Sequence, residues 1–144
     1  MMKKISILGS TGSIGRTSLD IINKKKNYFK IYLLSGHKNL NSIQQQIQKY
    51  KPEYFIISDN ETFKKVKNKN TNSKTKILNN FNYINIKKSD ITISAIPGID
   101  GLQPTVQMIK FSKKILIANK EAVVCGWNLV KKTANKNKTK IVPV

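Results

Sequence analysis

Three glycines at every third position near the amino terminus constrain the fold of this chain more than any other feature. They are Gly9, Gly12 and Gly15, and they separate an apolar run at residues 5–8 from a segment at 14–22 with the apolar spacing of a helix. This order is typical of a buried strand, a tight turn and the start of a helix. The usual dinucleotide fingerprint is G-x-G-x-x-G, whereas the spacing here is G-x-x-G-x-x-G. The turn alone leaves two interpretations open, a nucleotide site and an ordinary strand–helix turn.

A phosphate is the ligand that suits such a turn. A helix that begins near Gly12 leaves its first backbone N–H groups unpaired, at the positive end of the helix dipole. Glycine has no Cβ, so a pyrophosphate can approach the backbone at Gly12, and Gly15 lets the helix lie close to the strand. The hydroxyls of Ser10, Thr11 and Ser13 are further donors. If the turn binds a nucleotide, we expect these groups to face its diphosphate.

The next apolar run, residues 29–34, predicts a second strand and completes a strand–helix–strand unit. Folds of this kind contact the adenosine ribose at the end of that strand, where a carboxylate accepts the 2′-hydroxyl of NAD. Here the strand is followed by Ser35-Gly36-His37-Lys38-Asn39, which contains no acid. A cation among small polar groups favours the 2′-phosphate of NADP, unless Lys38 is only another surface lysine. We expect His37 to be a loop residue and not a catalyst.

Strands and helices alternate over the rest of the chain, which predicts an α/β fold. The further strands are expected at 54–57, 89–96, 113–118 and 141–144, and the further helices at 39–50, shortly after residue 58, at 103–109 and at 122–130. The lysine-rich segments 67–76 and 131–140 are predicted to be a solvated loop and a linker. Together these elements predict one Rossmann-like domain over residues 1–144. Its sheet is doubly wound and mostly parallel, with helices on both faces.

A second group of polar residues, Asn119-Lys120-Glu121, follows the predicted strand at 113–118. In an open parallel sheet, ligands bind at this carboxyl-terminal edge. Lys120 there is suited to an anionic substrate, and Asn119 to a hydrogen bond with a ribose or with the nicotinamide amide. The alternative is a turn in which Lys120 and Glu121 pair with each other.

The strong positive charge has two explanations. The chain has 27 Lys and Arg against 7 Asp and Glu, a formal net charge of +20, which raises the possibility of a small basic nucleic-acid-binding protein. However, the lysines are spread along the whole chain, and the only arginine, the preferred residue for bidentate phosphate and guanine contacts, is Arg16. Lys, Asn and Ile are abundant together, and all three can be encoded by A and T alone. We therefore favour compositional drift and expect no nucleic-acid partner.

Other classes of protein are excluded by simpler features. One cysteine, Cys125, and one histidine, His37, provide neither a disulfide framework nor a Cys/His zinc cluster. The sequence contains no run of about 18 apolar residues, the length that would indicate a membrane span. The chain also passes from Met-Met-Lys-Lys directly into a strand, without a secretory signal. We expect a cytoplasmic protein with no membrane partner.

Five segments, in order along the whole chain, resemble the 1-deoxy-D-xylulose 5-phosphate reductoisomerase family. They are Gly-Ser-Thr-Gly-Ser-Ile-Gly at 9–15, Gly-His-Lys-Asn at 36–39, Ala-Ile-Pro-Gly-Ile-Asp-Gly-Leu-Gln-Pro-Thr at 95–105, Ala-Asn-Lys-Glu at 118–121, and Ile-Val-Pro-Val at 141–144. The unusual glycine spacing is the spacing of this family. The combination is more specific than any single glycine pattern.

The resemblance implies an NADPH-dependent enzyme of the methylerythritol phosphate route to isoprenoid precursors. Such an enzyme rearranges and reduces 1-deoxy-D-xylulose 5-phosphate to 2-C-methyl-D-erythritol 4-phosphate with a divalent metal, Mg²⁺ or Mn²⁺, and a homodimer is implied for the full-length protein. By matched position, the resemblance implies that the NADPH phosphates and ribose are contacted by Thr11, Gly12, Ser13 and Ile14. It implies that the 2′-phosphate side is contacted by Gly36, Lys38 and Asn39, and the nicotinamide half by Asn119 and Glu121. It also implies that Lys120 contacts the substrate.

The carboxyl terminus departs from the family pattern. In the family, Pro-Val is followed by an Asp-Ser-Glu-His motif that begins the metal site, and then by further domains; the sequence in hand ends at Val144. We therefore expect no catalytic residue and no metal ligand in residues 1–144, and no activity from this segment alone. Two alternatives remain, a generic Rossmann binding module and the basic nucleic-acid-binding protein considered above.

Overall fold

A parallel sheet forms the centre of this chain, and the computed structural model describes residues 1–82 and 84–144. The strands are β1 (Lys3–Leu8), β2 (Phe29–Gly36), β3 (Tyr54–Ile57), β4 (Lys76–Leu78), β5 (Ser89–Ser94), β6 (Ser112–Ile117) and β7 (Lys140–Pro143). Their order across the sheet is β4-β3-β2-β1-β5-β6-β7, and every strand pairing in the described ranges is parallel. The first strand of the chain therefore lies in the middle of the sheet.

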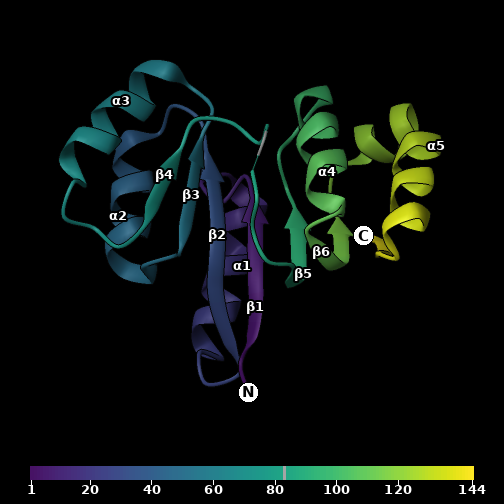
Figure 1. The fold of residues 1–144 in the computed structure, drawn as a ribbon, viewed down its shortest axis with the longest axis horizontal. Helices are drawn as coiled ribbons and strands as arrows, with labels where there is room; N and C mark the ends of the chain where they lie inside the picture. Colours follow the sequence, from purple (N-terminus) through teal and green to yellow (C-terminus); the bar gives the residue numbers. More distant parts are fainter. Residues whose placement is uncertain (83) are drawn as a thin grey trace.

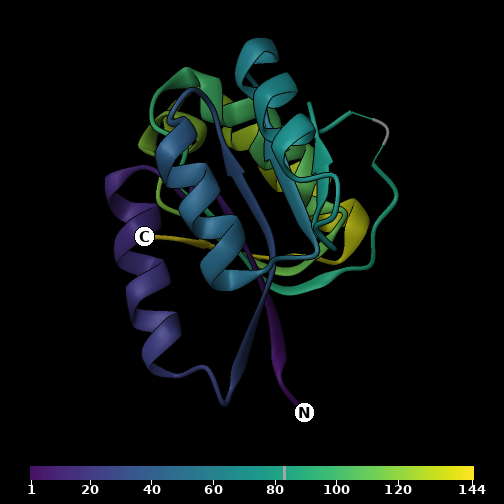
Figure 2. The ribbon, with the colours of Figure 1, turned by 90° about the vertical axis from the view of Figure 1, so that its left-hand side faces the viewer.

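Helices cover both faces of this sheet (Figure 1, Figure 2). They are α1 (Ser13–Lys24), α2 (Leu40–Tyr50), α3 (Asn60–Lys69), the 3-10 helix η1 (Ile99–Gly101), α4 (Leu102–Ile109) and α5 (Lys120–Asn137). On one face, Ile7 of β1 belongs to a buried cluster with Leu19 of α1, and on the other, Leu8 belongs to a cluster with Met108 of α4. The predicted Rossmann-like, doubly wound architecture is confirmed. Within the described ranges, no helix is long and apolar enough to cross a membrane.

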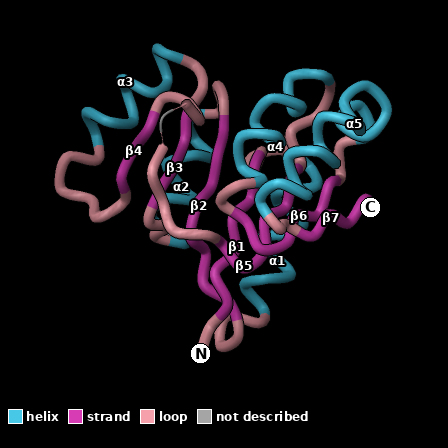
Figure 3. Tube along the Cα trace, turned by 45° about the vertical axis from the view of Figure 1, so that its right-hand side comes forward, coloured by secondary structure: helices cyan, strands magenta, loops and turns pink. Residues whose placement is uncertain are grey.

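The chain reverses its direction across the sheet after β4. The strands β1 to β4 are placed outward on one side of β1, and the chain then returns to place β5 on the other side. The described part of the returning segment, residues 79–88, contains no helix and lies over the sheet, where Phe81 and Ile84 pack near Tyr32 and Leu33. Figure 3 shows this segment as a loop in front of the strands. Because α1 and α4 lie on opposite faces, a space opens between the carboxyl ends of β1 and β5.

Two lysine-rich segments are more ordered than the sequence predicted. Residues 67–76, predicted as a solvated loop, contain the end of α3 and the first residue of β4. Residues 131–140, predicted as a linker, continue α5 and begin β7. The predicted loop and the predicted linker were therefore both too long. In α5 the reason is that Val130 and Ala134 are buried on one helix face, against β6, while the lysines remain exposed.

Asp90 connects the amino ends of three neighbouring strands. Its carboxylate accepts hydrogen bonds from the backbone N–H of Lys4 in β1 (2.8 Å) and from Nζ of Lys113 in β6 (2.9 Å). These bonds, the one from Lys113 first, lower the pKa of Asp90. A carboxyl group whose pKa is lower in the folded state stabilises the fold above its unfolded pKa. This contribution is lost as the pH falls through the folded value.

We expect Asp90→Asn to lower the free energy of unfolding near neutral pH by about 1 kcal/mol. The difference from the parent chain should shrink as the pH falls below the ordinary pKa of an aspartate, about 4, and through the lower pKa of folded Asp90. Urea unfolding of both proteins at several pH values measures this. Asp20→Asn, at an exposed position of α1, is a charge-matched control and should change the free energy by less than about 0.5 kcal/mol. If the free energies of unfolding of Asp90→Asn and the parent chain differ by the same amount at every pH, the stabilising role of the Asp90 carboxylate is contradicted.

Candidate functional site

The turn between β1 and α1 is held in place by hydrogen bonds from two neighbouring elements. The backbone N–H of Gly9 donates to Ser35 Oγ, and that of Ser10 to Ser35 O, each at 2.8 Å. On α2, the buried side chain of Gln46 forms two bonds with Ser10: Ser10 Oγ donates to Gln46 Oε1 (2.7 Å), and Gln46 Nε2 donates to Ser10 O (3.0 Å). The Ser10 hydroxyl, which the sequence suggested as a phosphate donor, is therefore engaged inside the protein.

The three glycines of this turn differ in what surrounds them. Gly9 has a φ of +80°, and a Cβ there would lie 2.9 Å from Ala95 O. A Cβ on Gly15 would lie 2.2 Å from Gly9 O, so the helix can approach the turn only with glycine at this position. At Gly12 the nearest atom to an added Cβ is Gly9 O at 3.6 Å, which is an ordinary contact. Two glycines are thus required by packing, whereas Gly12 borders open space.

That open space is a cleft of about 690 Å³ at the carboxyl ends of the central strands. The β1–α1 turn forms one wall, the ends of β2 and β3 a second, and the β5–α4 connection a third. The described part of the β4–β5 connection lies across them. The lining residues are Gly9, Thr11, Gly12, Ser35, Gly36, His37, Ser58, Asn80, Phe81, Asn82, Ile96, Pro97, Asp100, Gln103, Pro104 and Gln107. The position is the one where open α/β sheets bind ligands.

The start of α1 provides an anion-binding element at this cleft. Gly12 occupies the N-cap position, and no side chain caps the helix there. The first N–H groups of α1 are therefore available at the positive end of the helix dipole. Arg16 Nε donates to Thr11 O (2.8 Å) and so stiffens the turn from the outer side. The arrangement suits a phosphate or diphosphate that approaches Gly12.

The opposite wall is positioned by Asn119. This residue is 3% exposed, and its Oδ1 accepts a hydrogen bond from Ala122 N (3.1 Å), which caps α5. Its Nδ2 donates to Gly98 O (2.8 Å) and to Ile96 O. The side chain thereby joins α5 to the β5–η1 turn, which contributes Ile96 and neighbouring residues to the cleft.

Residues 80–82 of the β4–β5 connection form a further side of the cleft. Phe81 is buried and supplies an apolar surface. Gln107 of α4 donates to Asn82 Oδ1, which links the connection to the far wall, and Asn79 Nδ2 donates to Ile57 O (2.9 Å) at the end of β3. An apolar ring beside amide groups suits a planar heterocycle.

Few ionisable groups line the cleft. In the described part of the chain they are His37 and Asp100. Asp59 lies beside the cleft residue Ser58. The pKa of Asp59 is lowered mainly by hydrogen bonds from the hydroxyl and the backbone N–H of Thr62. The nearby charges of Lys38 and His37 lower it further, to a smaller extent. The described residues contain no group of three or more His, Cys, Asp and Glu side chains that could hold a metal ion.

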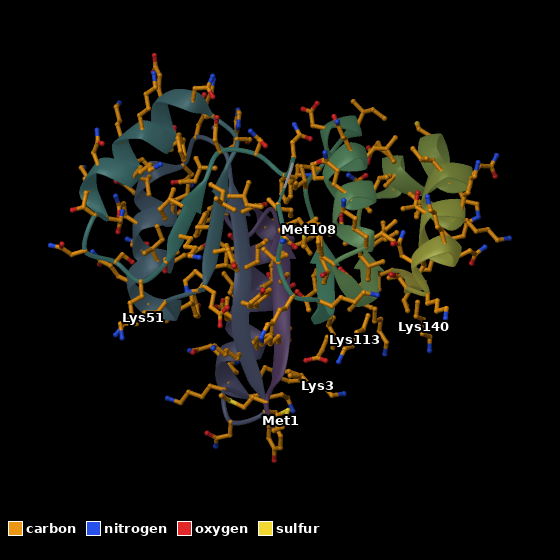
Figure 4. All side chains as sticks on the ribbon, in the orientation of Figure 1. Met1, Lys3, Lys51, Met108, Lys113 and Lys140 are labelled. Carbon is orange, nitrogen blue, oxygen red and sulfur yellow. The ribbon has the colours of Figure 1, made fainter. Side chains whose placement is uncertain are left out.

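Basic side chains are not concentrated at the cleft. The labelled Lys3, Lys51, Lys113 and Lys140 project from the other end of the sheet, where the strands begin (Figure 4). Among the described residues that line the cleft, none is a lysine or an arginine.

The predicted site residues fall into three groups. Those that line the cleft are Thr11, Gly12 and Gly36. Those that lie beside it, on the first turn of α1 or after β2, are exposed, and they are Ser13, Ile14, Lys38 and Asn39. Those at the start of α5 are outside the lining, and they are Asn119, Lys120 and Glu121. The side chain of Asn39 caps α2 by accepting from Ser42 N (3.2 Å).

Several lining residues were missed by the sequence reasoning. Ser58 follows a predicted strand, so the rule that ligands bind at carboxyl ends of strands would have found it. The sequence predicts only a loop position for His37. Phe81 and Asn82 carried no signal, because the segment that contains them lacks the periodicity of a helix or strand.

Comparison with known proteins gives one consistent result. A family model described as 1-deoxy-D-xylulose 5-phosphate reductoisomerase matches residues 5–126. A protein of that name from Pelagibacter ubique is 45% identical over 148 residues, which cover 99% of this chain and 38% of that protein. One from Clostridium kluyveri is 40% identical over 149 residues, which cover 99% of this chain and 39% of that protein. This chain therefore spans about two-fifths of the length of the curated relatives it matches.

Solved structures agree with this result. A 1-deoxy-D-xylulose 5-phosphate reductoisomerase from Zymomonas mobilis in complex with NADPH has the same fold, with a TM-score of 0.89 and 23% identity over 99% of this chain and 38% of that chain. A DOX-P reductoisomerase in complex with NADPH, fosmidomycin and magnesium has a TM-score of 0.87 and 30% identity over 99% of this chain and 36% of that chain.

Proposed function

The chain belongs to the 1-deoxy-D-xylulose 5-phosphate reductoisomerase family, and from this premise we propose that residues 1–144 bind NADPH in the cleft at the carboxyl ends of β1, β2 and β5. The observation that carries the proposal is the uncapped start of α1 at Gly12, which borders the cleft and leaves room beside the backbone. A diphosphate placed there accepts hydrogen bonds from the first N–H groups of α1. The helix dipole offsets part of its charge.

The position of the diphosphate also determines where the other parts of the coenzyme lie. The adenosine ribose lies toward the end of β2, where Gly36 lines the cleft and Lys38 and Asn39 follow. Thr11, Ser13 and Ile14 flank the diphosphate. The nicotinamide half extends toward the β5–η1 turn. Asn119 and Glu121 lie on the α5 side of that turn, and Lys120 is available to an anionic substrate. These residue roles are part of the proposal.

We assign the coenzyme-binding part of the family reaction to this segment. When bound, NADPH supplies the hydride, and the residues described here bind and orient it. For the whole protein we propose the family activity, the rearrangement and reduction of 1-deoxy-D-xylulose 5-phosphate to 2-C-methyl-D-erythritol 4-phosphate, in a cytoplasmic homodimer. The described residues do not fit a Mg²⁺ or Mn²⁺ site, because they bring no acidic cluster together. No metal-dependent step is therefore assigned to them.

Gly12→Ala tests the coenzyme site directly. The added methyl group has room in the folded chain, since its nearest neighbour is Gly9 O at 3.6 Å, but it occupies the space that the diphosphate needs. We expect the Kd for NADPH to rise at least about tenfold, measured by fluorescence titration. Ser18→Ala, at a half-buried position of α1 where Ser18 Oγ donates to Ile14 O, is the control and should leave the Kd unchanged. Equal binding by Gly12→Ala and the parent chain would refute the proposed site.

A further inference from the structure

The buried face of α2 contains a polar side chain that the proposed function does not yet use. Gln46 is 6% exposed and lies on the same helix face as the buried Ile43 and Ile47. We propose that Gln46 is a positioning residue of the coenzyme site. It orients the peptide group between Ser10 and Thr11, so that the N–H of Thr11 faces the diphosphate. This inference rests on the proposed coenzyme site and deepens it.

The peptide group between Ser10 and Thr11 is held by a single side chain. The peptide groups on either side of it are bonded elsewhere in the fold. The N–H of Ser10 donates to Ser35 O, and Thr11 O accepts from Arg16 Nε, each at 2.8 Å. For the peptide group itself, the described residues provide one hydrogen bond, from Gln46 Nε2 to Ser10 O (3.0 Å). Its orientation therefore depends on Gln46.

The Ser10 hydroxyl fixes the amide of Gln46 in the direction that this bond needs. Ser10 Oγ donates to Gln46 Oε1 at 2.7 Å. A backbone carbonyl oxygen can only accept a hydrogen bond, so the NH₂ end of the Gln46 amide is the end that must face Ser10 O. The two bonds together hold one amide against both polar oxygens of Ser10.

This bond determines where the N–H of Thr11 points. The peptide is trans, so its C=O and N–H point in opposite directions. Because Ser10 O is directed at Gln46, the N–H of Thr11 is directed away from α2. Thr11 lines the cleft and Gln46 does not. No described residue accepts a hydrogen bond from this N–H, which is therefore available to a diphosphate beside the first N–H groups of α1.

The backbone of the turn limits how far the peptide group can move without Gln46. The N–H of Gly12 donates to Gly9 O (3.2 Å), so the peptide group is the centre of a four-residue turn. Turning it over requires a positive φ at Thr11, which this residue does not have and which is unfavourable for a β-branched side chain. Loss of Gln46 should therefore loosen the peptide group without reversing it. We expect coenzyme binding to weaken and not to disappear.

The test compares NADPH and NADH binding to the parent chain, Gln46→Met and Gln46→Glu by fluorescence titration. Methionine fills a similar space but forms neither bond, so the Kd for NADPH should rise about tenfold. The Kd for NADH should rise by the same factor, within about twofold, because the diphosphate is common to both coenzymes. Glutamate keeps an acceptor for the Ser10 hydroxyl but has no donor for Ser10 O. Gln46→Glu should therefore bind at least as weakly as Gln46→Met.

Thr75→Val is the matched control for a loss of stability alone. Thr75 Oγ1 donates to Pro52 O (2.6 Å), so this variant, like Gln46→Met, leaves a buried carbonyl group without its side-chain donor. Both residues lie at the amino ends of β3 and β4, whereas the cleft lies at the carboxyl ends of the strands. Thr75→Val should unfold at a lower urea concentration than the parent chain but leave both Kd values unchanged.

The backbone amide signal of Thr11 in nitrogen–proton correlation NMR spectra provides a direct readout. Saturating NADPH should shift this signal in the parent chain and shift it less in Gln46→Met. The inference is overturned if Gln46→Met raises the Kd no more than Thr75→Val does, or if Gln46→Glu binds like the parent chain. It is also overturned if Gln46→Met weakens one coenzyme alone. A parent chain that does not bind NADPH overturns the proposed function itself, which is a different result from a parent chain and a Gln46→Met chain that bind equally well.

Discussion

Gly15→Ala is expected to destabilise the fold by about 3 kcal/mol or more. In an ordinary helix the same change is favourable by nearly 1 kcal/mol, because alanine has the higher helix propensity. Here the added Cβ would lie 2.2 Å from Gly9 O and 2.7 Å from Ser10 Cα. Both are backbone atoms of a turn that Ser35 and Gln46 hold in place, so the clash is relieved only if α1 moves away from β1.

Chemical denaturation measures this loss, and Gly12→Ala is the matched control. The control makes the same change three residues earlier, at a position where the nearest atom to the new Cβ is 3.6 Å away. It should lower the free energy of unfolding by no more than about 1 kcal/mol, the cost of replacing glycine with alanine at the N-cap of α1. A Gly15→Ala protein as stable as the parent chain would show that the contact between α1 and the turn is looser than described.

Asn119→Ala is expected to cost about 3 kcal/mol. The change removes the cap of α5 and leaves the carbonyl groups of Ile96 and Gly98 without the amide donor that they share. Because the residue is 3% exposed, water does not easily replace these bonds. The turn that forms one wall of the cleft should loosen, so NADPH binding should weaken as well.

Two further variants separate the roles of Asn119. Asn39→Ala removes a cap with one hydrogen bond at an exposed position and should cost only about 1 kcal/mol. Asn119→Asp keeps an acceptor for Ala122 N but replaces the donor with a negative charge beside two carbonyl oxygens. It should therefore be at least as unstable as Asn119→Ala. If Asn119→Asp is instead as stable as the parent chain, the bonds to Ile96 and Gly98 contribute nothing, and only the cap matters.

The sequence was sufficient to predict the fold and one wall of the cleft. The glycine spacing at residues 9–15 located the β1–α1 turn, because strand, turn and helix each have a local signature there. The apolar runs located the buried strands for the same reason. The end of α5 was missed because its buried face beyond Val130 consists of Ala134 alone among lysines.

The rest of the site depends on contacts between distant segments. Asn119 follows a strand, and both a ligand contact and a helix cap suit an asparagine there; only the structure shows that its side chain bonds Ile96 and Gly98. Phe81 reaches the cleft through a connection with no periodic pattern. The hydrogen bond between His37 and Ser58 requires β2 and β3 to be neighbours, which sequence spacing alone does not specify.

The central place of β1 in the sheet affects how the chain is made. Ile5 pairs with Ile31 on one side and with Ile91 on the other. A ribosome therefore releases the partner for one edge of β1 early and the partner for the other edge much later. During that interval the side of β1 that will pair with β5 remains unpaired, and nascent copies of the chain can associate through it. Slow translation between residues 31 and 91 should consequently lower the yield of soluble protein, and rapid translation of this stretch should raise it.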